Sequence, residues 1–238
     1  MKKVVITGGL GYIGMELAKI YSGKSRYNDI TVIDTNFFSE RVSQLKRWNI
    51  KFKQIDILDI DALEKEINKA DLIYHLAGIT NVGTTKDDID KIRDQEIKNV
   101  GISGTRNVIK FSSEKCKIIF PSTHVVFEGL NKTIKNIDEN YELMPVLEYS
   151  KGKVQSEKDL MNSNKNYVVL RLGSVYGKSF DSTRLNIMPN LFSKITSFDG
   201  EIKLFAGGNQ LKSLVSVIDV ARCMEFVGED KTINKEIF

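Results

Sequence analysis

Short apolar runs alternate with amphipathic stretches along most of the chain. Residues 4–6 form a β-branched run too short for a helix, and residues 12–21 then place apolar side chains at helical spacing. Further strand-like runs occur at residues 29–34, 52–57, 71–78, 117–120 and 165–171. Parallel sheets covered on both faces contain such apolar strands, separated by helices. The pattern therefore predicts an α/β fold with a parallel sheet between two layers of helices.

The stretches between and after these runs predict further helices and a loop. An irregular loop is expected at residues 126–145 and a short strand at residues 202–205. The expected helices lie at residues 59–68, 88–113, 187–198 and 220–227, with one more that begins at residue 149.

The alternation of strand-like and helix-like stretches becomes irregular after residue 171, which suggests that the chain is divided there. Residues 1–175 are expected to form the main domain and residues 176–238 a smaller lobe. Within that lobe, residues 219–228 are expected to pack back on the main domain.

The composition is typical of a folded globular protein of 238 residues, with 41% apolar and 28% charged side chains. The net charge of +4 arises from lysines interleaved with acidic residues, so no basic block for nucleic acid is visible. The apolar run at residues 4–6 is too short for a signal peptide, and no later window is long enough to span a membrane. Cys116 and Cys223 are far apart in the sequence and are expected to be buried free thiols in a reducing compartment. We therefore expect a cytoplasmic protein that binds neither nucleic acid nor membrane, with no metal site.

Three glycines follow the first predicted strand with the spacing G-x-x-G-x-x-G. Gly8, Gly11 and Gly14 stand between a strand and a helix, the context that a dinucleotide-binding loop requires, although a turn without a ligand is the alternative. Glycine lets the backbone approach a pyrophosphate, and a helix N-terminus offers free N–H groups to phosphates. Asp34 ends the next strand, where a carboxylate binds an adenosine ribose and repels a 2′-phosphate. The pattern predicts a dinucleotide site that favours NAD over NADP.

The predicted strand at residues 71–78 ends in small side chains. Ala77 and Gly78 leave space for a ligand beside the carboxyl end of the sheet. His75 lies within the apolar part of this strand and is expected to be a hydrogen-bonded structural residue rather than a catalytic one.

Tyr149 and Lys153 are four residues apart in a predicted helix and therefore share one face. A tyrosine with a pKa near 10 is a poor base at neutral pH, but a neighbouring ammonium stabilises the phenolate and lowers that pKa. Ser122 and Thr123 follow the strand at residues 117–120, where a hydroxyl can hold a substrate oxygen. These residues predict proton transfer through Tyr149 during hydride transfer, and an ordinary exposed helix start is the alternative.

The chain resembles the extended short-chain dehydrogenase/reductase family, specifically the NAD-dependent epimerase/dehydratase group that acts on nucleotide sugars. The resemblance rests on TGGLGYIG at 7–14, HLAG at 75–78, PSTHVVFEG at 121–129, YSKGK at 149–153, RLGSVYG at 171–177 and VSVIDVA at 215–221. It implies a Rossmann-type doubly wound parallel sheet with a small C-terminal substrate lobe. Because relatives continue beyond the position of Phe238, we expect a short or truncated lobe.

The resemblance also assigns roles to single residues. Thr123, Tyr149 and Lys153 are implied as catalytic residues, with Tyr149 as the acid and base. The implied cofactor-binding residues are Gly8, Gly11, Tyr12, Ile13, Gly14, Asp34, Asp56, Ile57, Leu76, Ala77, Gly78, Tyr149 and Lys153. The implied substrate-binding residues are Ser122, Thr123, Ser174 and Lys212, the last in place of an arginine that often grips the diphosphate.

The implied activity is an NAD-dependent epimerase that transfers hydride to and from the ring of a nucleoside-diphosphate sugar. His124 and Val125 stand where 4,6-dehydratases have an acidic pair, which disfavours a dehydratase. A 4-keto-sugar reductase is a second alternative, although those enzymes usually take NADPH, which Asp34 disfavours. A non-catalytic NAD-binding relative is the third, against which the retained Tyr149 and Lys153 count. The resemblance also implies a homodimer through the helices around residues 88–113 and 149–162.

Overall fold

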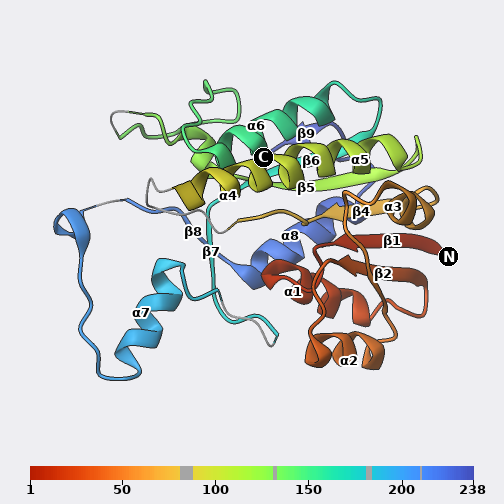
Figure 1. The fold of residues 1–238 in the computed structure, drawn as a ribbon, viewed down its shortest axis with the longest axis horizontal. Helices are drawn as coiled ribbons and strands as arrows, with labels where there is room; N and C mark the ends of the chain where they lie inside the picture. Colours follow the sequence, from red (N-terminus) through yellow and green to blue (C-terminus); the bar gives the residue numbers. More distant parts are fainter. Residues whose placement is uncertain (81–87, 131–132, 181–183, 210) are drawn as a thin grey trace.

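The computed structural model describes residues 1–80, 88–130, 133–180, 184–209 and 211–238. Its main feature is a seven-stranded parallel sheet in the order β3-β2-β1-β4-β5-β6-β9 (Figure 1). The strands are β1 (Lys2–Thr7), β2 (Asn28–Asp34), β3 (Lys51–Gln54), β4 (Leu72–His75), β5 (Lys117–Thr123), β6 (Asn166–Leu172) and β9 (Glu236–Ile237). The chain begins at the centre, runs outward to β3 and then crosses to β4, so the prediction of a doubly wound α/β sheet is confirmed.

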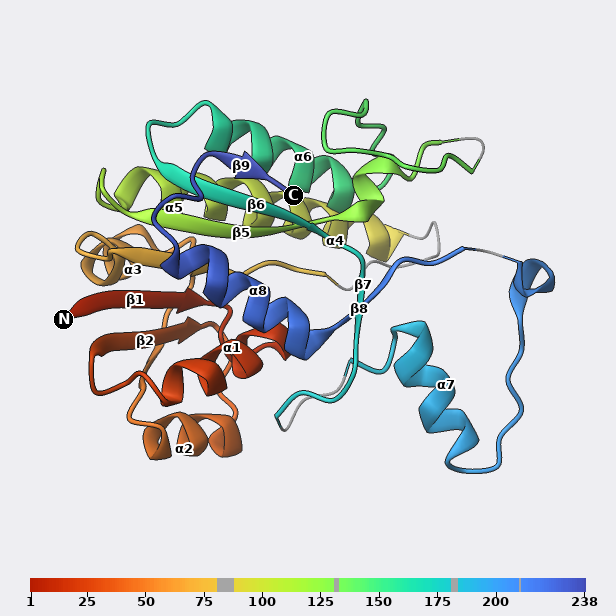
Figure 2. The same ribbon diagram turned by 180° about the vertical axis from the view of Figure 1, so that it is seen from behind.

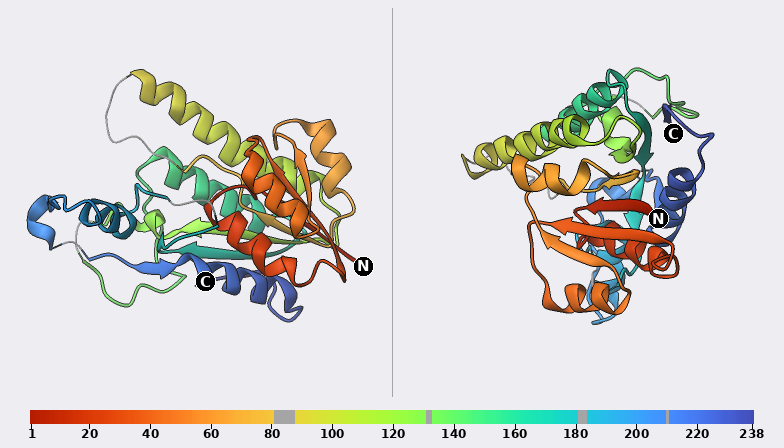
Figure 3. Two further views of the ribbon diagram at one scale, coloured as in Figure 1. Left: turned by 90° about the horizontal axis from the view of Figure 1, so that it is seen from below. Right: turned by 90° about the vertical axis from the view of Figure 1, so that its right-hand side faces the viewer.

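Successive side chains of each strand point to opposite faces of the sheet, which divides the core into two layers. Val4 of β1 lies on one face of the sheet with α1 (Tyr12–Ser22), α2 (Ser39–Arg47) and α8 (Val217–Glu229). Val5 lies on the other face with α3 (Ile60–Ile67), α5 (Gly104–Phe111) and α6 (Glu148–Met161). Figure 3 shows the sheet between these two helix layers.

Helix α8 closes the first of these layers although it lies near the end of the sequence. Val220 and Met224 are buried in the same cluster as Leu17 of α1, and α8 crosses in front of the strands in Figure 2. The Lys2 ammonium forms an ion pair with Glu229 at 2.9 Å, which ties β1 to the end of α8. The segment that follows α8 then reaches β6 and adds β9 in parallel.

The long helix expected at residues 88–113 is present but changes its winding. It consists of α4 (Asp88–Lys98), a π-helical segment η1 (Asn99–Ser103) and α5. The strand expected at residues 52–57 ends at Gln54, because Asp56 accepts a hydrogen bond from Leu58 N at 2.9 Å and starts a turn. Asp59 then caps α3 through Ala62 N.

Strand β5 is longer than expected, since it continues through Pro121 to Thr123. Its pairing with β4 stops at Ile119, so beyond that point only β6 is hydrogen-bonded to β5. A proline without a backbone N–H is tolerated at such an edge. Ser122 and Thr123 therefore lie within the strand rather than after it.

The C-terminal lobe departs most from expectation. The helix expected at residues 187–198 is α7 (Met188–Thr196), which stands away from the main sheet in Figures 1 and 2. The strand expected at residues 202–205 is wrong, because the described part of this segment contains the 3-10 turn η3 (Phe205–Gly208) instead. Two short strands that the sequence did not suggest, β7 (Ser174–Tyr176) and β8 (Leu214–Ser216), pair in parallel and connect the lobe to β6 and α8. No helix in the described ranges is long and apolar enough to cross a membrane.

Candidate cofactor and active site

Two of the three motif glycines in the loop between β1 and α1 pack too closely against neighbouring backbone to carry a side chain. Gly8 has φ of +64°, and a Cβ there would lie 2.7 Å from Ala77 Cα. A Cβ on Gly14 would lie 2.5 Å from Gly9 Cα, so the helix packs directly on the turn. At Gly11 the nearest atom would be the Gly8 carbonyl oxygen, at 3.0 Å. The loop is thus a backbone cradle at a helix N-terminus, and this geometry fits a dinucleotide phosphate.

Asp34 closes one side of this cradle. It is almost buried at the end of β2, and its carboxylate accepts hydrogen bonds from Leu10 N at 3.1 Å and from Asn36 N at 3.0 Å. The Arg41 guanidinium donates to Leu10 O at 2.7 Å, so α2 also supports the loop. The carboxylate lies directly beside the loop, as a ribose-binding acid requires.

Tyr12 and Ile13 are the first residues of α1, and their side chains make contacts within the protein. The Tyr12 hydroxyl donates a hydrogen bond to Gly177 O, and the Ile13 side chain packs against the core. Only the backbone of these two residues is therefore a candidate for phosphate binding.

Asp56 and Ile57 follow β3 at the same end of the sheet. Asp56 is exposed, whereas Ile57 is buried under Gly104, where a Cβ would lie 2.2 Å from Ile57 Cδ1. Asn107 holds the Ile57 carbonyl oxygen at 3.0 Å. This corner is thus a fixed apolar surface bordered by an acid.

The three implied catalytic residues come together from β5 and α6. Thr123 ends β5 and forms a side-chain hydrogen bond with Tyr149, which lies in the first turn of α6. One helical turn later, the Lys153 ammonium donates to Pro121 O at 2.8 Å and lies 5.9 Å from the centroid of the Tyr149 ring. It also sits 4.3 Å above the Phe120 ring. The sequence prediction that these side chains share one site agrees with this geometry.

The protonation of the pair differs from the expectation. Burial raises the pKa of Tyr149, and the Arg184 charge and the Thr123 hydrogen bond offset this only in part. Burial lowers the pKa of Lys153 to about 8, with the Glu157 carboxylate opposing the shift. The expected lowering of the Tyr149 pKa by Lys153 is therefore wrong for this structure, because desolvation dominates and the ammonium is turned toward the Pro121 carbonyl.

A path of small residues leads from the glycine loop to Tyr149. Leu76 N donates to Thr7 O at 3.1 Å, and Ala77 N donates to Thr7 Oγ1 at 3.2 Å. These two hydrogen bonds fix the end of β4 against β1. A small cavity beyond is lined by Ala77, Gly78, Ile79, Ile97, Gly101, Thr105, Phe120, Tyr149, Gly152, Lys153 and Ser156. A Cβ on Gly78 would meet nothing within 4 Å, so this side of the site is open.

His75 lies under this path and is structural, as expected. Its Nδ1 lies 2.8 Å from Thr7 Oγ1 and its Nε2 lies 3.0 Å from Thr105 Oγ1. Burial lowers the pKa of His75 to about 3, so the ring is neutral at physiological pH.

Ser122 does not face the site. Its hydroxyl donates to the buried carboxylate of Glu157, which forms an ion pair with Arg171 at 2.8 Å. The predicted substrate-binding role of Ser122 therefore needs correction, because its hydroxyl is committed to this internal pair below α6.

Ser174 and Lys212 lie where the lobe joins the sheet. Ser174 pairs with Leu214 across β7 and β8, and Ser174 N donates to Ser213 O at 2.8 Å. Lys212 is exposed just before β8. The topology thus brings these two residues close together, and their role toward a substrate stays a prediction.

Two residues of the lobe were missed by sequence reasoning. Arg184 donates to Thr80 O at 2.9 Å. Its charge opposes the rise that burial causes in the pKa of Tyr149 and of Tyr12. Asn190 is nearly buried, accepts a hydrogen bond from Gly177 N at 2.8 Å and donates to Arg184 O at 2.9 Å. No motif marks either residue, because only the fold of the lobe carries them across to the main domain.

In the part of the chain that the structure describes, no group of three or more His, Cys, Asp or Glu side chains could hold a metal ion.

Comparison with known proteins agrees with this arrangement. The model of the NAD dependent epimerase/dehydratase family matches residues 4–238. The chain is 24% identical to a UDP-N-acetyl-alpha-D-glucosaminuronate decarboxylase of Bacillus cytotoxicus over 99% of this chain and 74% of the relative. It is 29% identical to a dTDP-D-glucose 4,6-dehydratase of Dictyostelium discoideum over 74% of this chain and 44% of the relative. The chain thus spans three quarters of one relative and less than half of the other.

Among solved structures, a UDP-glucuronic acid 4-epimerase from Bacillus cereus in complex with UDP-glucuronic acid and NAD has the same fold. The TM-score is 0.82 at 23% identity, over 99% of this chain and 76% of that chain.

Proposed function

Because the chain belongs to the NAD-dependent epimerase/dehydratase family, we propose that it is an NAD-dependent epimerase acting on a nucleoside-diphosphate sugar. The proposal rests chiefly on one observation: Thr123, Tyr149 and Lys153 converge at the end of β5, beside the path that leads to the glycine loop. Relatives with these nucleotide-sugar activities include the decarboxylase, dehydratase and epimerase described above.

The residues that would hold NAD are those of the cradle. The backbone of Gly8 to Gly14 would bind the pyrophosphate, and Asp34 the adenosine ribose. When bound, NAD supplies the acceptor and donor for the hydride that leaves and returns to a sugar carbon. Asp34 makes NAD the favoured form, since a carboxylate beside a 2′-phosphate is repulsive.

Tyr149 Oη takes the proton from the sugar hydroxyl and later returns it. Tyr149 has to be in its phenolate form to accept this proton, and it returns the proton as the neutral phenol. Burial opposes the phenolate by raising the pKa of Tyr149, and the Arg184 charge offsets this in part. Thr123 Oγ1 donates to the substrate oxygen and keeps it next to Tyr149. An epimerase needs no outside reductant, because the same sugar loses and regains the hydride.

The neighbours of Thr123 favour an epimerase over a 4,6-dehydratase. Elimination of water needs an acid and a base after this threonine, where the chain has His124 and Val125. His124 Nδ1 donates a hydrogen bond to the Leu172 carbonyl oxygen at 3.0 Å, so this ring nitrogen is already engaged within the protein. A 4-keto-sugar reductase remains the second candidate, and Asp34 disfavours its usual NADPH.

The wider organisation follows from the same proposal. Residues 1–175 form the NAD-binding domain and residues 176–238 the substrate lobe, with 219–228 returning to the main domain. The enzyme works in carbohydrate metabolism in the cytoplasm, where NAD is available, and forms a homodimer through the helices around residues 88–113 and 149–162.

Replacing Tyr149 with Phe tests the proposal. We expect Tyr149→Phe to lower turnover by about 10²- to 10⁴-fold, because the proton then has no acceptor at the right place. The amount of bound NAD should be unchanged, since the ring and the cradle are retained. The measurement is nucleotide-sugar conversion across a panel of UDP- and dTDP-sugars, with NAD quantified by absorbance after denaturation.

Tyr27→Phe is the matched control, because Tyr27 is 76% exposed and remote from the site. It should convert substrate like the unaltered protein. Equal turnover of both variants would exclude Tyr149 as the acid and base.

A further inference from the structure

The end of β5 that carries Thr123 is held by the sheet on one side only. Residues 120–123 pair with β6 but no longer with β4. Their other side reaches the small cavity that Tyr149 lines. This stretch also contains the Pro121 carbonyl oxygen, which accepts the hydrogen bond from Lys153. Contacts from outside the sheet therefore decide how firmly this part of the proposed active site is held.

Glu157 of α6 supplies one of these contacts. It is 1% exposed, and its carboxylate accepts a hydrogen bond from the Ser122 hydroxyl, one residue before Thr123. Glu157 lies one helical turn beyond Lys153 and two turns beyond Tyr149, so the three side chains share one face of α6. Lys153 and Glu157 thus bind two successive residues of the strand from the same helix.

The Glu157 carboxylate also fixes β6 and the loop that leads to α6. Arg171 of β6 donates to this carboxylate from Nη2 at 2.8 Å and from Nε at 3.3 Å. Arg171 Nη1 donates to the Glu139 carbonyl oxygen of the loop at 2.7 Å. The side chains of the ion pair are 8% and 2% exposed. Because an incomplete buried ion pair is costly, this network opposes displacement of any of its members.

Glu157 is, in addition, the carboxylate whose charge acts on the Lys153 ammonium. Burial lowers the pKa of Lys153 to about 8, and the Glu157 charge opposes this shift. Among the described residues that line the cavity beside Lys153, none is a carboxylate. The neighbouring elements present Tyr149 on α6, Arg171 on β6 and His75 on β4, whose ring is neutral at physiological pH. Loss of the Glu157 charge would therefore lower the Lys153 pKa further.

We infer that Glu157 is a positioning residue of the proposed active site. Through Ser122 it holds the end of β5 against α6, so that Thr123 stays hydrogen-bonded to Tyr149, and its negative charge supports the Lys153 ammonium. The inference rests on the proposed function for its effect on turnover, whereas its effect on Lys153 is measurable without any activity.

NMR titration of Lys153 tests the charge of Glu157. The full chain is labelled with ¹³C at lysine Cε, and the signal that disappears in Lys153→Met is assigned to Lys153. The midpoint should lie near pH 8 in the unaltered chain and about one pH unit lower in Glu157→Gln, because the ammonium then lacks its carboxylate.

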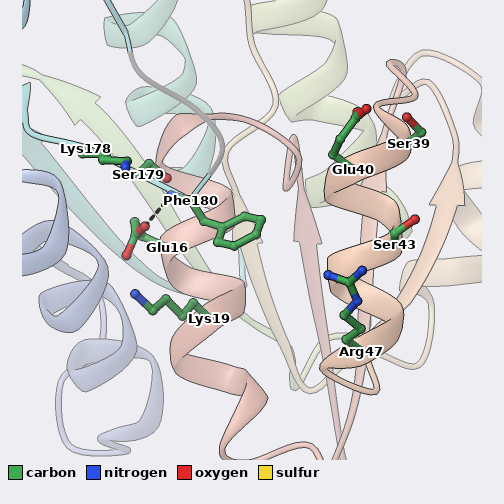
Figure 4. A pocket seen from close by; sticks show the side chains of 9 residues that line it. All are labelled: Glu16, Lys19, Ser39, Glu40, Ser43, Arg47, Lys178, Ser179 and Phe180. Atoms are coloured by element: carbon green, nitrogen blue, oxygen red, sulfur yellow. Dashed lines mark hydrogen bonds between the residues drawn. The ribbon is translucent and has the colours of Figure 1, made fainter.

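Glu16→Gln is the matched control. Glu16 is 6% exposed on α1, in the other helix layer, and its carboxylate accepts a hydrogen bond from Phe180 N at 2.7 Å (Figure 4). Its replacement removes a buried hydrogen-bonded carboxylate remote from Lys153, so the midpoint should stay near that of the unaltered chain. Equal midpoints in Glu157→Gln and Glu16→Gln would overturn the inference.

A double variant covers the case in which Glu157→Gln does not fold because the Arg171 charge is left buried alone. Glu157→Gln/Arg171→Met replaces the pair by neutral side chains of similar volume, a change that proteins often tolerate. It should lower the Lys153 midpoint as well, since the Glu157 charge is again absent. An unchanged midpoint in this variant would count against the inference in the same way.

Ser122→Ala tests the contact with the strand separately, because it leaves the ion pair of Glu157 and Arg171 intact. We expect kcat for the nucleotide sugar to fall about tenfold with KM changed less than about twofold, since Thr123 is less firmly held beside Tyr149. The Lys153 midpoint should be unchanged.

Ser112→Ala is the control for this variant. Ser112 is 5% exposed, and its hydroxyl donates to Ile109 O at 3.2 Å at the end of α5, outside the site. It should leave kcat unchanged, and equal kcat values in Ser122→Ala and Ser112→Ala would overturn the inference. If the unaltered chain converts no sugar of the UDP- and dTDP-sugar panel, the proposed function fails, and the Lys153 titration then decides the role of Glu157 by itself.

Discussion

The three motif glycines of the first loop are glycines for different physical reasons. At Gly8 both the positive φ and the 2.7 Å approach to Ala77 exclude a side chain, and at Gly14 the close packing on Gly9 does so. At Gly11 the contact is milder, at 3.0 Å, so the protein interior alone does not demand glycine there. The space above Gly11 is thus the part of the cradle that a bound phosphate would need.

Gly8→Ala is expected to destabilise the protein by about 1–3 kcal/mol, because a left-handed conformation and a steric contact are combined at one residue. Gly78→Ala is the matched control, as its Cβ would meet no atom within 4 Å. Urea denaturation of both variants measures the difference. Equal unfolding free energies would contradict the clash between Gly8 and Ala77.

His75 provides a pH-dependent prediction. Its pKa is about 3 in the folded protein, against 6.5 for an ordinary histidine, so the unfolded chain takes up a proton that the folded chain excludes. Its contribution is therefore complete above about pH 6.5 and is lost as the pH falls toward 3, by about 1.4 kcal/mol per pH unit. Unfolding titrations between about pH 4 and pH 6 should show a shallower pH slope for His75→Gln than for the unaltered chain. The same slope in both proteins would mean that His75 is not buried in its neutral form.

At the scale of elements, the π segment between α4 and α5 explains how His75 is held. The Gly101 carbonyl accepts hydrogen bonds from Thr105 Oγ1 at 2.5 Å and from Ser156 Oγ at 3.0 Å. Thr105 also reaches His75 Nε2, so the changed winding of one helix joins β4 to α6. The regular apolar spacing of residues 88–113 predicts a helix but carries no sign of this extra residue in the turn.

Thr105→Val is expected to lower the unfolding free energy by about 1–3 kcal/mol, because His75 Nε2 loses its buried partner at nearly constant side-chain volume. Thr196→Val is the control, since Thr196 is exposed at the end of α7 and should change stability by less than about 0.5 kcal/mol. Thermal unfolding of the two variants distinguishes them. A Thr105→Val protein as stable as Thr196→Val would show that the network contributes nothing.

At the scale of the whole molecule, the last part of the chain completes the first core. Five residues of α8 are at most 4% exposed and cover the sheet beside α1: Val217, Val220, Ala221, Met224 and Val227. The Lys117 ammonium, on strand β5, donates to the carbonyl oxygens of Val227 and Asp230 and so binds the end of α8. The proposed boundary at residue 175 is thus one of function rather than of independent folding.

A chain ending at residue 175 is therefore expected to lack cooperative unfolding, because the face of the sheet under α8 is left exposed. Urea titration followed by near-ultraviolet circular dichroism compares it with the full chain. A sharp transition in the shortened chain would show that residues 1–175 fold without α8.

The sequence by itself determined the order of the strands β1 to β6, most of the helices between them, the glycine loop, Asp34 and the pair Tyr149 and Lys153, but it indicated neither α2 nor β9. These features depend on local spacing and on apolar periodicity, which the chain displays directly. Only the tertiary structure decided that Ser122 faces Glu157, that β7 pairs with β8, and that Arg184 approaches Tyr149. It also decided the Tyr149 and Lys153 pKa shifts, because burial arises from residues distant in sequence.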